Sequence, residues 1–262
     1  MLHGKVTMLG TGTSHGVPMI GCTCATCRST DPRDRRLRPS IHVALRDRIS
    51  VLVDTSIDLR QQALAHGITR VDAVLFTHAH ADHILGLDDL RGFNALQGSP
   101  IPCYASHGTW DTIRRQFSYV FEGPLQEGGG VPQLITHEVT GPFFVQGIRV
   151  VPVPLWHGKL PILGFRIGNF AYLTDCNRIP DESWRMVENV GVLVLDALRD
   201  EPHETHFTVT EAVAAAERIG ARHTYFTHMT HDLPHAKTNA RLPAGMELAY
   251  DGLVLDIEVD AA

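Results

Sequence analysis

The sequence has no long hydrophobic run and no excess of positive charge. No apolar stretch approaches the roughly 18 residues that a helix needs to cross a bilayer. The chain of 262 residues carries 23 Lys and Arg against 29 Asp and Glu, which gives a formal net charge of -6 at pH 7. A negative total does not favour binding to nucleic acid or to an anionic membrane. We therefore expect a protein that binds no membrane and is not built for nucleic acid.

The N-terminus also lacks the apolar core of a signal peptide. Residues 1–14, MLHGKVTMLGTGTS, run directly into strand-like sequence, so we predict a cytoplasmic protein. The chain has five cysteines, an odd number, and three of them lie in the segment GCTCATC as Cys22, Cys24 and Cys27. In a reducing compartment such a cluster indicates a metal site rather than disulfides. Cys103 and Cys176 stand alone and are interpreted as core residues.

The composition is otherwise that of a globular protein, with 44% apolar and 20% charged residues. We found no internal repeat, no low-complexity tract and no convincing linker. We therefore predict a single domain over residues 1–262, which is long enough to bury a large core. The segment Glu122–Pro132, EGPLQEGGGVP, is the best candidate for a connection between two halves. The 16 histidines are the most informative surplus.

Short β-rich runs alternate with helical patterns along the chain. Helices are predicted at Asp58–His66, Leu87–Leu96, Gly108–Phe117, Asp181–Glu188 and Thr210–Ile219. Strands are predicted at Lys5–Leu9, Ile41–Leu45, Ile49–Asp54, Ala73–Thr77, Gly147–Val153, Gly164–Ile167, Ala171–Asp175, Gly191–Asp196, His223–Thr227 and Leu253–Glu258. Hairpin turns are expected at Arg46–Arg48 and Gly168–Asn169. Thr208 or Thr210 can cap the last helix, and Gly220 ends it. This order predicts two packed sheets with helices outside.

The segment FTHAHADHILG places several metal-binding side chains at the end of a buried strand. His78, His80, Asp82 and His83 follow the apolar run Val71–Phe76. Histidines two positions apart can converge on one ion, and the next Asp-His pair can point toward a second. Imidazole and carboxylate together suit zinc, manganese or iron. The alternative is a polar loop whose histidines face water, which this density of ligand types makes a poor explanation.

The motif His-x-His-x-Asp-His after a buried strand resembles that of the metallo-β-lactamase fold. The resemblance implies an α/β fold, an αββα sandwich of two mixed β-sheets flanked by helices, over nearly the whole chain. Further ligands of this family follow strands, and His157, Asp175 and His228 occupy such positions. The resemblance then implies one metal held by His78, His80 and His157. A second metal is held by Asp82, His83 and His228, with Asp175 bridging the two.

A paired metal centre has a net positive charge, which suits an anionic ester. A hydroxide between the two cations would attack phosphorus, and manganese or zinc is expected, with iron as an alternative. Among the ligands, Asp82 is also assigned to catalysis. Alone, His157 or His228 would be interpreted as an ordinary histidine, and Asp175 as a turn residue. All three occur in the order expected for the family, each after an apolar strand, and this favours their assignment as metal ligands.

The N-terminal segment GTGTSHGVPMIGCTCATC narrows the resemblance to one subgroup. It resembles the phosphoribosyl 1,2-cyclic phosphate phosphodiesterases of the carbon–phosphorus lyase pathway, in the ribonuclease Z-like superfamily. That resemblance implies a structural zinc held by Cys22, Cys24, Cys27 and His231, and it suggests a homodimer. The pathway belongs to phosphonate metabolism. The alternative is three buried free thiols.

Other polar residues are weaker candidates. His206, in ETHFTVTEA, corresponds by the same resemblance to a histidine that assists catalysis, either as a proton donor or as a phosphoryl ligand; capping of the next helix is the alternative. His203 is a weaker contender for that role. Lys159 could hold a substrate phosphate, and His15 could face the site, but solvated or structural roles fit both equally. The remaining histidines are interpreted as ordinary ones: His3, His42, His66, His107, His137, His223 and His235.

The leading hypothesis is a metal-dependent phosphodiesterase for a small cyclic or diester phosphate, such as a ribosyl 1,2-cyclic phosphate. A ribonuclease Z-like endonuclease for tRNA 3′ ends is the second candidate. Such an endonuclease would need a basic surface to bind RNA. The segment Glu122–Pro132 contains no Lys or Arg, which argues against it, whereas the basic run Arg33–Arg38 argues for it. A third candidate, of another class, is a binding or carrier protein of pyrroloquinoline quinone biosynthesis, whose N-terminus is similar. The presence of every expected ligand favours an enzyme.

Overall fold

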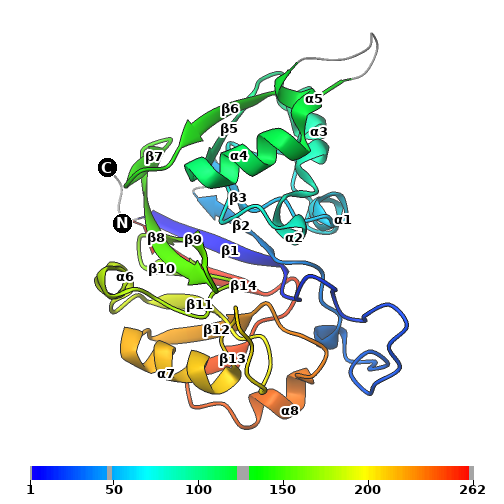
Figure 1. Ribbon diagram of the computed structural model, residues 1–262, viewed down its shortest axis with the longest axis vertical. Helices are drawn as coiled ribbons and strands as arrows, with labels where there is room; N and C mark the ends of the chain where they lie inside the picture. The colour runs from blue at the N-terminus through cyan, green and yellow to red at the C-terminus, as the bar shows by residue number, and fades with distance from the viewer. Residues whose placement is uncertain (1, 46–48, 123–129, 260–262) are drawn as a thin grey trace.

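The computed structural model describes residues 2–45, 49–122 and 130–259. These residues form two β-sheets packed face to face, with helices on both outer faces (Figure 1). The first sheet has the order β14 (Val254–Val259), β1 (Leu2–Gly10), β2 (Ser40–Leu45), β3 (Ile49–Val53), β4 (Ala73–Leu75), β5 (Ile101–Ala105) and β6 (Leu134–Glu138). The second has the order β13 (Met246–Leu248), β12 (His223–Thr227), β11 (Val192–Asp196), β10 (Phe170–Leu173), β9 (Leu160–Ile167), β8 (Ile148–His157) and β7 (Phe143–Val145). The predicted αββα sandwich is confirmed.

Each sheet is mixed, with an antiparallel half and a parallel half. Strands β14, β1, β2 and β3 are antiparallel, whereas β3, β4, β5 and β6 run parallel. In the second sheet, β7 to β10 are antiparallel and β10 to β13 are parallel. Parallel strands end at the same edge of a sheet, so the loops that follow them gather there. This topology brings polar residues after several strands to one edge.

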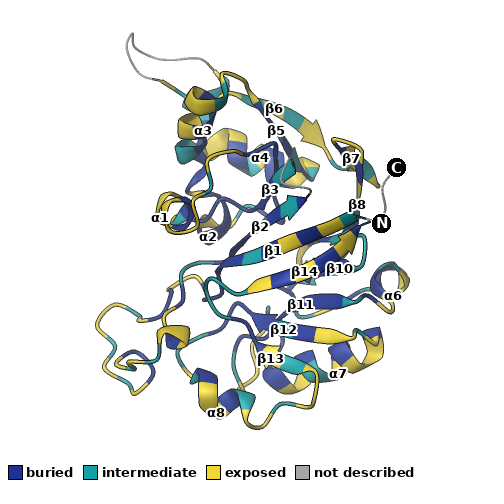
Figure 2. Cartoon of the chain, turned by 180° about the vertical axis from the view of Figure 1, so that it is seen from behind, coloured by how far each residue is buried: buried dark blue, intermediate teal, exposed yellow. Residues whose placement is uncertain are grey.

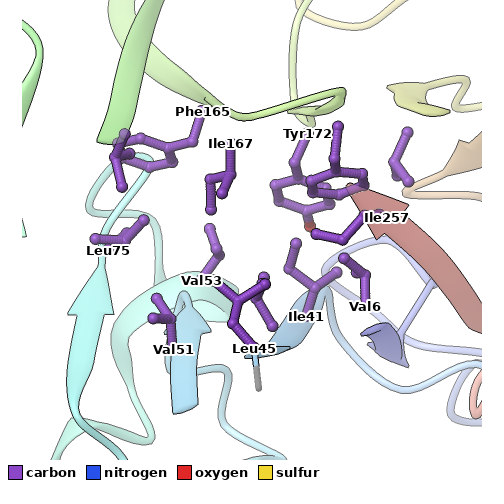
Figure 3. Close-up of a cluster of buried hydrophobic side chains, with 14 of the residues drawn as sticks. Val6, Ile41, Leu45, Val51, Val53, Leu75, Phe165, Ile167, Tyr172 and Ile257 are labelled. Atoms are coloured by element: carbon purple, nitrogen blue, oxygen red, sulfur yellow. The ribbon is translucent and has the colours of Figure 1, made fainter. Parts of the chain in front are cut away.

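The core between the two sheets is made by alternating side chains of the facing strands. Strand β14 shows the alternation most clearly, since its residues are exposed and buried in turn. Val6 and Ile41 of the first sheet lie opposite Phe165, Ile167 and Tyr172 of the second (Figure 3). Burial of each such apolar side chain contributes about 1.5–3 kcal/mol. The period of two in these strands therefore fixes which face of each sheet is inside.

The helices cover the outer faces and enclose two further apolar layers. One layer lies under α1 (Leu59–Ala65), α3 (Leu90–Gln97) and α4 (His107–Gln116), and the other under α6 (Asp181–Val187) and α7 (Val209–Ile219). Figure 2 shows exposed residues on the outer sides of α3 and α7. The shorter helices are α2 (Ala81–Ile84), α5 (Ser118–Phe121) and α8 (His235–Asn239), with 3-10 turns η1 (Pro32–Asp34) and η2 (Leu87–Asp89). No helix among the described residues is both long and apolar enough to cross a membrane.

Helix α7 has the boundaries that its sequence predicts. The Thr208 hydroxyl accepts a hydrogen bond from the amide of Glu211, and the Glu211 carboxylate accepts one from the amide of Thr208. This capping box satisfies two amides that the first turn leaves unpaired. The helix ends at Gly220, whose φ of 70° is the left-handed conformation that glycine adopts without strain. Thr208 rather than Thr210 is therefore the cap.

Several predicted boundaries were wrong. Strand β8 was predicted to end at Val153 but continues through Pro154 to His157. Strand β7 pairs only with residues 148–150, so the prolines of β8 lie where that side of the strand has no neighbour. The segment Glu122–Pro132 does not connect the two halves, since α5 and β6 flank it on the side of the first sheet. Its residues 123–129, like the turn Arg46–Arg48, lie outside the described residues. The crossing between sheets follows β6 instead.

A long loop between β1 and β2, residues 11–39, packs against the segment that follows β12. Met229 donates its amide hydrogen to the carbonyl of Thr11 and accepts a bond from the amide of Thr13. The buried guanidinium of Arg36 donates to the carbonyls of Thr230 at 2.8 Å and Leu233 at 2.5 Å. Segments nearly 200 positions apart in sequence are thus held together. In Figure 1 this loop projects from the lower right.

Candidate metal centre

The loops after four strands meet at one edge of the sandwich. His78 and His80 follow β4, His157 ends β8, Asp175 follows β10, and His228 follows β12. The two sheets are joined there by a hydrogen bond from the amide of Leu163 to the carbonyl of Thr77. The sequence-predicted ligands therefore lie together, although they come from distant parts of the chain.

Backbone strain is concentrated at this edge. Asp175 has a φ of 57°, His228 of 63°, and Asp54, at the end of β3, of 64°. Residues other than glycine adopt this left-handed conformation at a cost of about 1–3 kcal/mol, and such strain gathers at functional sites. In each case a buried strand ends and the chain turns sharply, so that a polar side chain is aimed into the site.

The predicted ligands form two adjacent groups. The first consists of His78, His80 and His157, and the second of Asp82, His83, Asp175 and His228; within each group the donor atoms lie within 4.8 Å of one another. These are the two sets that the resemblance implied. Of the seven side chains, only those of His80 and Asp82 are not deeply enclosed: His80 is exposed, and Asp82 is at the edge of burial.

Asp175 lies between the two groups. Its Oδ1 is 3.0 Å from Nε2 of His228 and 3.9 Å from Nε2 of His78, and its Oδ2 is 3.1 Å from Nε2 of His83. Asp82 completes the second group, with Oδ2 3.5 Å from Nε2 of His228 and 3.6 Å from Nε2 of His83. A carboxylate in the position of Asp175 can reach two neighbouring cations at once.

The hydrogen bonding and the charge of the site fit a pair of cations. The buried Nε2 atoms of His78, His83 and His228 form no well-aligned hydrogen bond among the described residues, although those of His83 and His228 lie 3.1 and 3.0 Å from the Asp175 carboxylate. Poorly satisfied buried nitrogens cost about 1–3 kcal/mol each, so three at one place indicate a ligand that accepts their lone pairs. Two carboxylates and several imidazoles match the preferences of zinc, manganese or iron.

The pKa shifts of the ligands run in opposite directions, according to whether burial or the nearby carboxylates dominate. Burial lowers the pKa of His78 well below its usual value. Burial also opposes a charge on His228, but Asp175 outweighs it and raises the pKa of His228 to about 10. The pKa of Asp175 itself lies well below its usual range, because His228 and His83 outweigh the opposing effect of its burial. The carboxylates are thus ionised and surrounded by groups that compensate their charge.

Asp54 was missed by the sequence prediction. Its Oδ2 is 2.7 Å from Nδ1 of His83, and both side chains are fully buried. The same carboxylate accepts hydrogen bonds from the amide and the hydroxyl of Thr77. Asp54 accepts a hydrogen bond from Nδ1 of His83. The ring therefore carries its proton on Nδ1 and its lone pair on Nε2, which faces Asp175. The signal was present in the sequence, since Asp54 ends an apolar strand as the predicted ligands do.

Asp196, at the end of β11, was missed in the same way. Its Oδ1 is 3.1 Å from Nδ1 of His206 and 3.7 Å from Nδ1 of His228, and its Oδ2 accepts a hydrogen bond from the amide of Phe207. His206 is buried, and its ring lies 4.7 Å from that of His157 and stacks on that of His228 at 4.6 Å. The structure therefore brings His206 to the predicted ligands, while the exposed His203 lies 5.2 Å from it on the outer side.

A second cluster, outside this centre, contains Cys22, Cys24, Cys27 and His231, whose donor atoms lie within 4.8 Å of one another. Nδ1 of His231 is 3.2 Å from Sγ of Cys24 and 3.6 Å from Sγ of Cys22. The amide of Cys27, followed by His231, lowers the pKa of Cys24 to about 6, which favours the thiolate that binds metal. The set is consistent with a structural zinc site.

The other candidates are not among the grouped donors. Lys159 and His15 are both exposed, and His15 belongs to no donor group formed by the described residues. Cys103 and Cys176 are fully buried in the apolar layers, as expected. His107, which was interpreted as an ordinary histidine, is exposed at the start of α4, beside Glu138 and Asp111. His235 is buried, and its ring contacts Tyr250.

Comparisons with known proteins agree with this geometry. A family model described as the Beta-lactamase superfamily domain matches residues 50–229. A crystal structure of a new diphosphatase from the PhnP family is 47% identical, with a TM-score of 0.92 over 99% of each chain. The chain belongs to the PhnP family of metallo-β-lactamase-fold proteins. As a PhnP-family protein with clustered His and Asp donors, it is a metal-dependent hydrolase.

Two other relatives extend the comparison. An octanoyltransferase of Porphyromonas gingivalis is 38% identical over 251 residues, which are 95% of this chain; the chain spans only 51% of that protein's length. The zinc-bound PqqB from Methylobacterium extorquens is 23% identical, with a TM-score of 0.77 over 97% of this chain and 100% of the other. At that identity the likeness shows the common fold and nothing about substrate.

Proposed function

We propose that this PhnP-family hydrolase is a phosphodiesterase that cleaves a small cyclic or diester phosphate at a dimetal centre. The observation that carries the proposal is the position of Asp175 between two groups of donors, beside three buried imidazole nitrogens that form no well-aligned hydrogen bond among the described residues. The diphosphatase name of the 47% identical relative supports chemistry at phosphorus. A diphosphate, whose phosphorus is likewise bonded to two substituents through oxygen, belongs to the same substrate class.

The assigned ligands are those predicted from the sequence. His78, His80 and His157 would hold one cation, and Asp82, His83 and His228 the other, with Asp175 shared. Two divalent cations at this place would supply Lewis-acid stabilisation of the phosphoryl oxygens and would lower the pKa of an attacking water molecule. The Cys3His cluster would hold a structural zinc, which ties the β1–β2 loop to the segment carrying His228 and His231.

His206 is assigned to the leaving group. Asp196 accepts a hydrogen bond from Nδ1 of His206 and so orients the ring, which would act as the proton donor through Nε2. As the bond between phosphorus and the leaving oxygen breaks, that oxygen would take the Nε2 proton and depart as a neutral hydroxyl. The ring stacked on His228 is close enough to the centre for this role. Lys159 and His15 are not assigned a role.

The two alternative functions are less well supported. An endonuclease for tRNA needs a basic surface, whereas the net charge of this chain is -6. A carrier protein for cofactor biosynthesis has no use for a complete set of catalytic donors, and all seven are grouped here. The carrier alternative gives His206 and Asp196 no role beside the centre, whereas an endonuclease could use this pair as a phosphodiesterase would.

Substrate profiling with element analysis tests the proposal. The purified protein is expected to contain zinc at the Cys3His cluster together with manganese, zinc or iron at the dimetal centre. It should hydrolyse bis(p-nitrophenyl) phosphate and a 2′,3′-cyclic nucleotide in preference to a precursor tRNA. Asp175→Asn should abolish hydrolysis and lower the metal content, and Asp256→Asn, on the exposed side of β14, should change neither. Preferred cleavage of the precursor tRNA would reverse the ranking.

A further inference from the structure

A pocket of about 560 Å³ opens beside His78 and His80. One wall comes from residues 154–156 of β8 and residues 160–163 of β9, and the other from residues 106–112 around the start of α4. In Figure 1, α4 lies over the first sheet and β8 and β9 belong to the second, so the pocket lies between the two halves beside the metal edge. Its volume is in the range that ligand sites occupy, about 300–1,000 Å³.

The wall from the second sheet is apolar and contains an aromatic ring. Trp156, Leu160 and Ile162 line it, and Leu160 is 41% exposed, unusual for leucine at the mouth of a polar site. The guanidinium of Arg178 lies 4.8 Å from the centre of the Trp156 ring. Trp156 is thus half-buried against Arg178 while it also lines the pocket. A flat ring stacked on such a tryptophan is a favourable arrangement.

The pocket offers no cationic side chain for a second phosphate. No lysine or arginine is among the described residues that line it, and Glu182 stands at its rim. His107 is the histidine of the lining outside the predicted ligands, and Glu138 at 3.2 Å and Asp111 at 3.4 Å already surround it. Two arginines contact the lining from behind, Arg115 through Thr112 and Arg178 through Trp156, and neither lines the pocket itself. A phosphomonoester in this pocket would therefore lose hydration without a direct cationic partner. A neutral group is therefore favoured.

The opposite wall supplies a few hydroxyl groups. Ser106 caps α4, and its Oγ lies 2.9 Å from the hydroxyl of Thr109. Thr112 donates its hydroxyl hydrogen to the carbonyl of Gly108 and accepts a hydrogen bond from Arg115, which leaves one lone pair on its oxygen. An apolar pocket with a small number of hydroxyls along one side is suited to a heterocycle, whose faces are apolar and whose edges are polar.

We propose that this pocket holds a nucleobase, so that the substrate is a nucleoside phosphate, in diester or diphosphate linkage, whose reacting phosphorus lies at His78 and His80. The inference rests on the proposed function for the position of the phosphorus, and it names the group that lies beyond it. The base stacks on Trp156 between Leu160 and the Thr109 side, and the ribose spans the distance to the metal edge. A phosphoribosyl substrate, which has a terminal phosphomonoester in place of a base, fits this pocket less well.

A matched pair of ligands tests this by calorimetry on the whole protein as purified. Adenosine 5′-monophosphate and ribose 5-phosphate share the sugar and the phosphate and differ in the base. Stacking of one base is worth about 1–3 kcal/mol, so the nucleotide should bind about 5- to 150-fold more tightly. Trp156→Ala should reduce this ratio to nearly one without weakening ribose 5-phosphate. The intrinsic fluorescence of Trp156 should also be quenched by the nucleotide.

Two controls separate the pocket from general effects on folding. Trp184 lies under the guanidinium of Arg218 at 3.8 Å, as Trp156 lies under Arg178, but it does not line the pocket. Trp184→Ala should leave the ratio unchanged. Leu160→Ser should lower the ratio even if Trp156→Ala fails to fold, and Leu96→Ser, at an exposed leucine on α3, should not change it.

The outcomes are distinct. Equal affinities for the two ligands in the unmodified protein would overturn the inference, and so would tighter binding of octyl phosphate than of adenosine 5′-monophosphate, since the pocket would then take an aliphatic chain. Hydrolysis of bis(p-nitrophenyl) phosphate is measured in parallel. If that hydrolysis is absent while the nucleotide keeps its advantage, the proposed function fails and the assignment of the pocket stands.

Discussion

The carboxylate of Asp54 lies 2.7 Å from Nδ1 of His83, and neither side chain has any exposed surface. This contact fixes which nitrogen of His83 carries the proton. It also links the end of β3 to helix α2, which carries the Asp82-His83 half of the His-x-His-x-Asp-His motif. A residue outside the motif thereby decides whether one of the motif's histidines can bind a cation.

Replacing Asp54 by Asn should lower metal affinity. The amide group would donate a hydrogen bond to Nδ1 of His83, so the ring proton would move to Nε2 and block the lone pair. Loss of a partner of this kind typically costs about 10- to 100-fold in metal affinity. Titration with manganese or zinc measures the change, and Asp256→Asn, at a surface position, serves as the control. Unchanged affinity would mean that Asp54 does not set the tautomer.

Replacing Cys24 by Ser should weaken the dimetal centre although Cys24 touches neither of its groups. Sγ of Cys24 is 3.2 Å from His231, three residues beyond His228. Without the thiolate, the structural zinc should be lost and the segment that carries His228 should be held less firmly. Element analysis should show one zinc fewer and partial loss of the other two metals. Cys103→Ser should keep all of them; full dimetal occupancy and activity in Cys24→Ser would refute the coupling.

Replacing His206 by Ala should slow hydrolysis to a degree that depends on the leaving group. A 2′,3′-cyclic nucleotide expels a poor leaving group, and loss of the proton donor should lower kcat by about 10²- to 10⁴-fold. The p-nitrophenolate ion needs no proton, so bis(p-nitrophenyl) phosphate should be affected about tenfold or less. Asp196→Asn should show the same pattern more weakly, and His203→Ala should not. Equal losses on both substrates would instead assign His206 to the phosphoryl oxygens.

Acidification should destabilise the fold partly through His42, on β2. Burial, followed by the charge of His66, lowers the pKa of His42 to about 4. Because this folded-state pKa lies below the unfolded value of about 6.5, the neutral ring contributes stability above pH 6.5, and that contribution is lost as the pH falls toward 4. In denaturant unfolding across this range, His42→Gln should lose less stability than the unmodified protein. The control is His3→Gln, and identical pH slopes for His42→Gln and the unmodified protein would contradict the assignment.

Much of the fold and of the site could be predicted because the signals are local. Each predicted ligand follows an apolar strand, and alternation along the strands identified the buried faces. Asp54 and Asp196 carry the same local signal, since each ends an apolar strand, but their partners could not be predicted, because the contacts with His83 and His206 span 29 and 10 positions. The end of strand β8 was predicted wrongly for a related reason. A proline such as Pro154 normally ends a strand, because it has no amide hydrogen to donate. Only the length of β7 shows that no neighbouring strand needs a hydrogen bond from this position. The sequence predicts where polar groups gather, and packing decides which of them touch.

The position of β1 between β14 and β2 has a consequence for biosynthesis. Strand β1 precedes β14 by more than 240 positions, so its hydrogen bonding on that side cannot form until β14 has been synthesised. His228 and His231 also emerge late, long after the histidines and cysteines with which they are grouped. Neither donor set is complete before residues 228–231 have been synthesised, so full ligation at both clusters has to wait for this late segment of the chain.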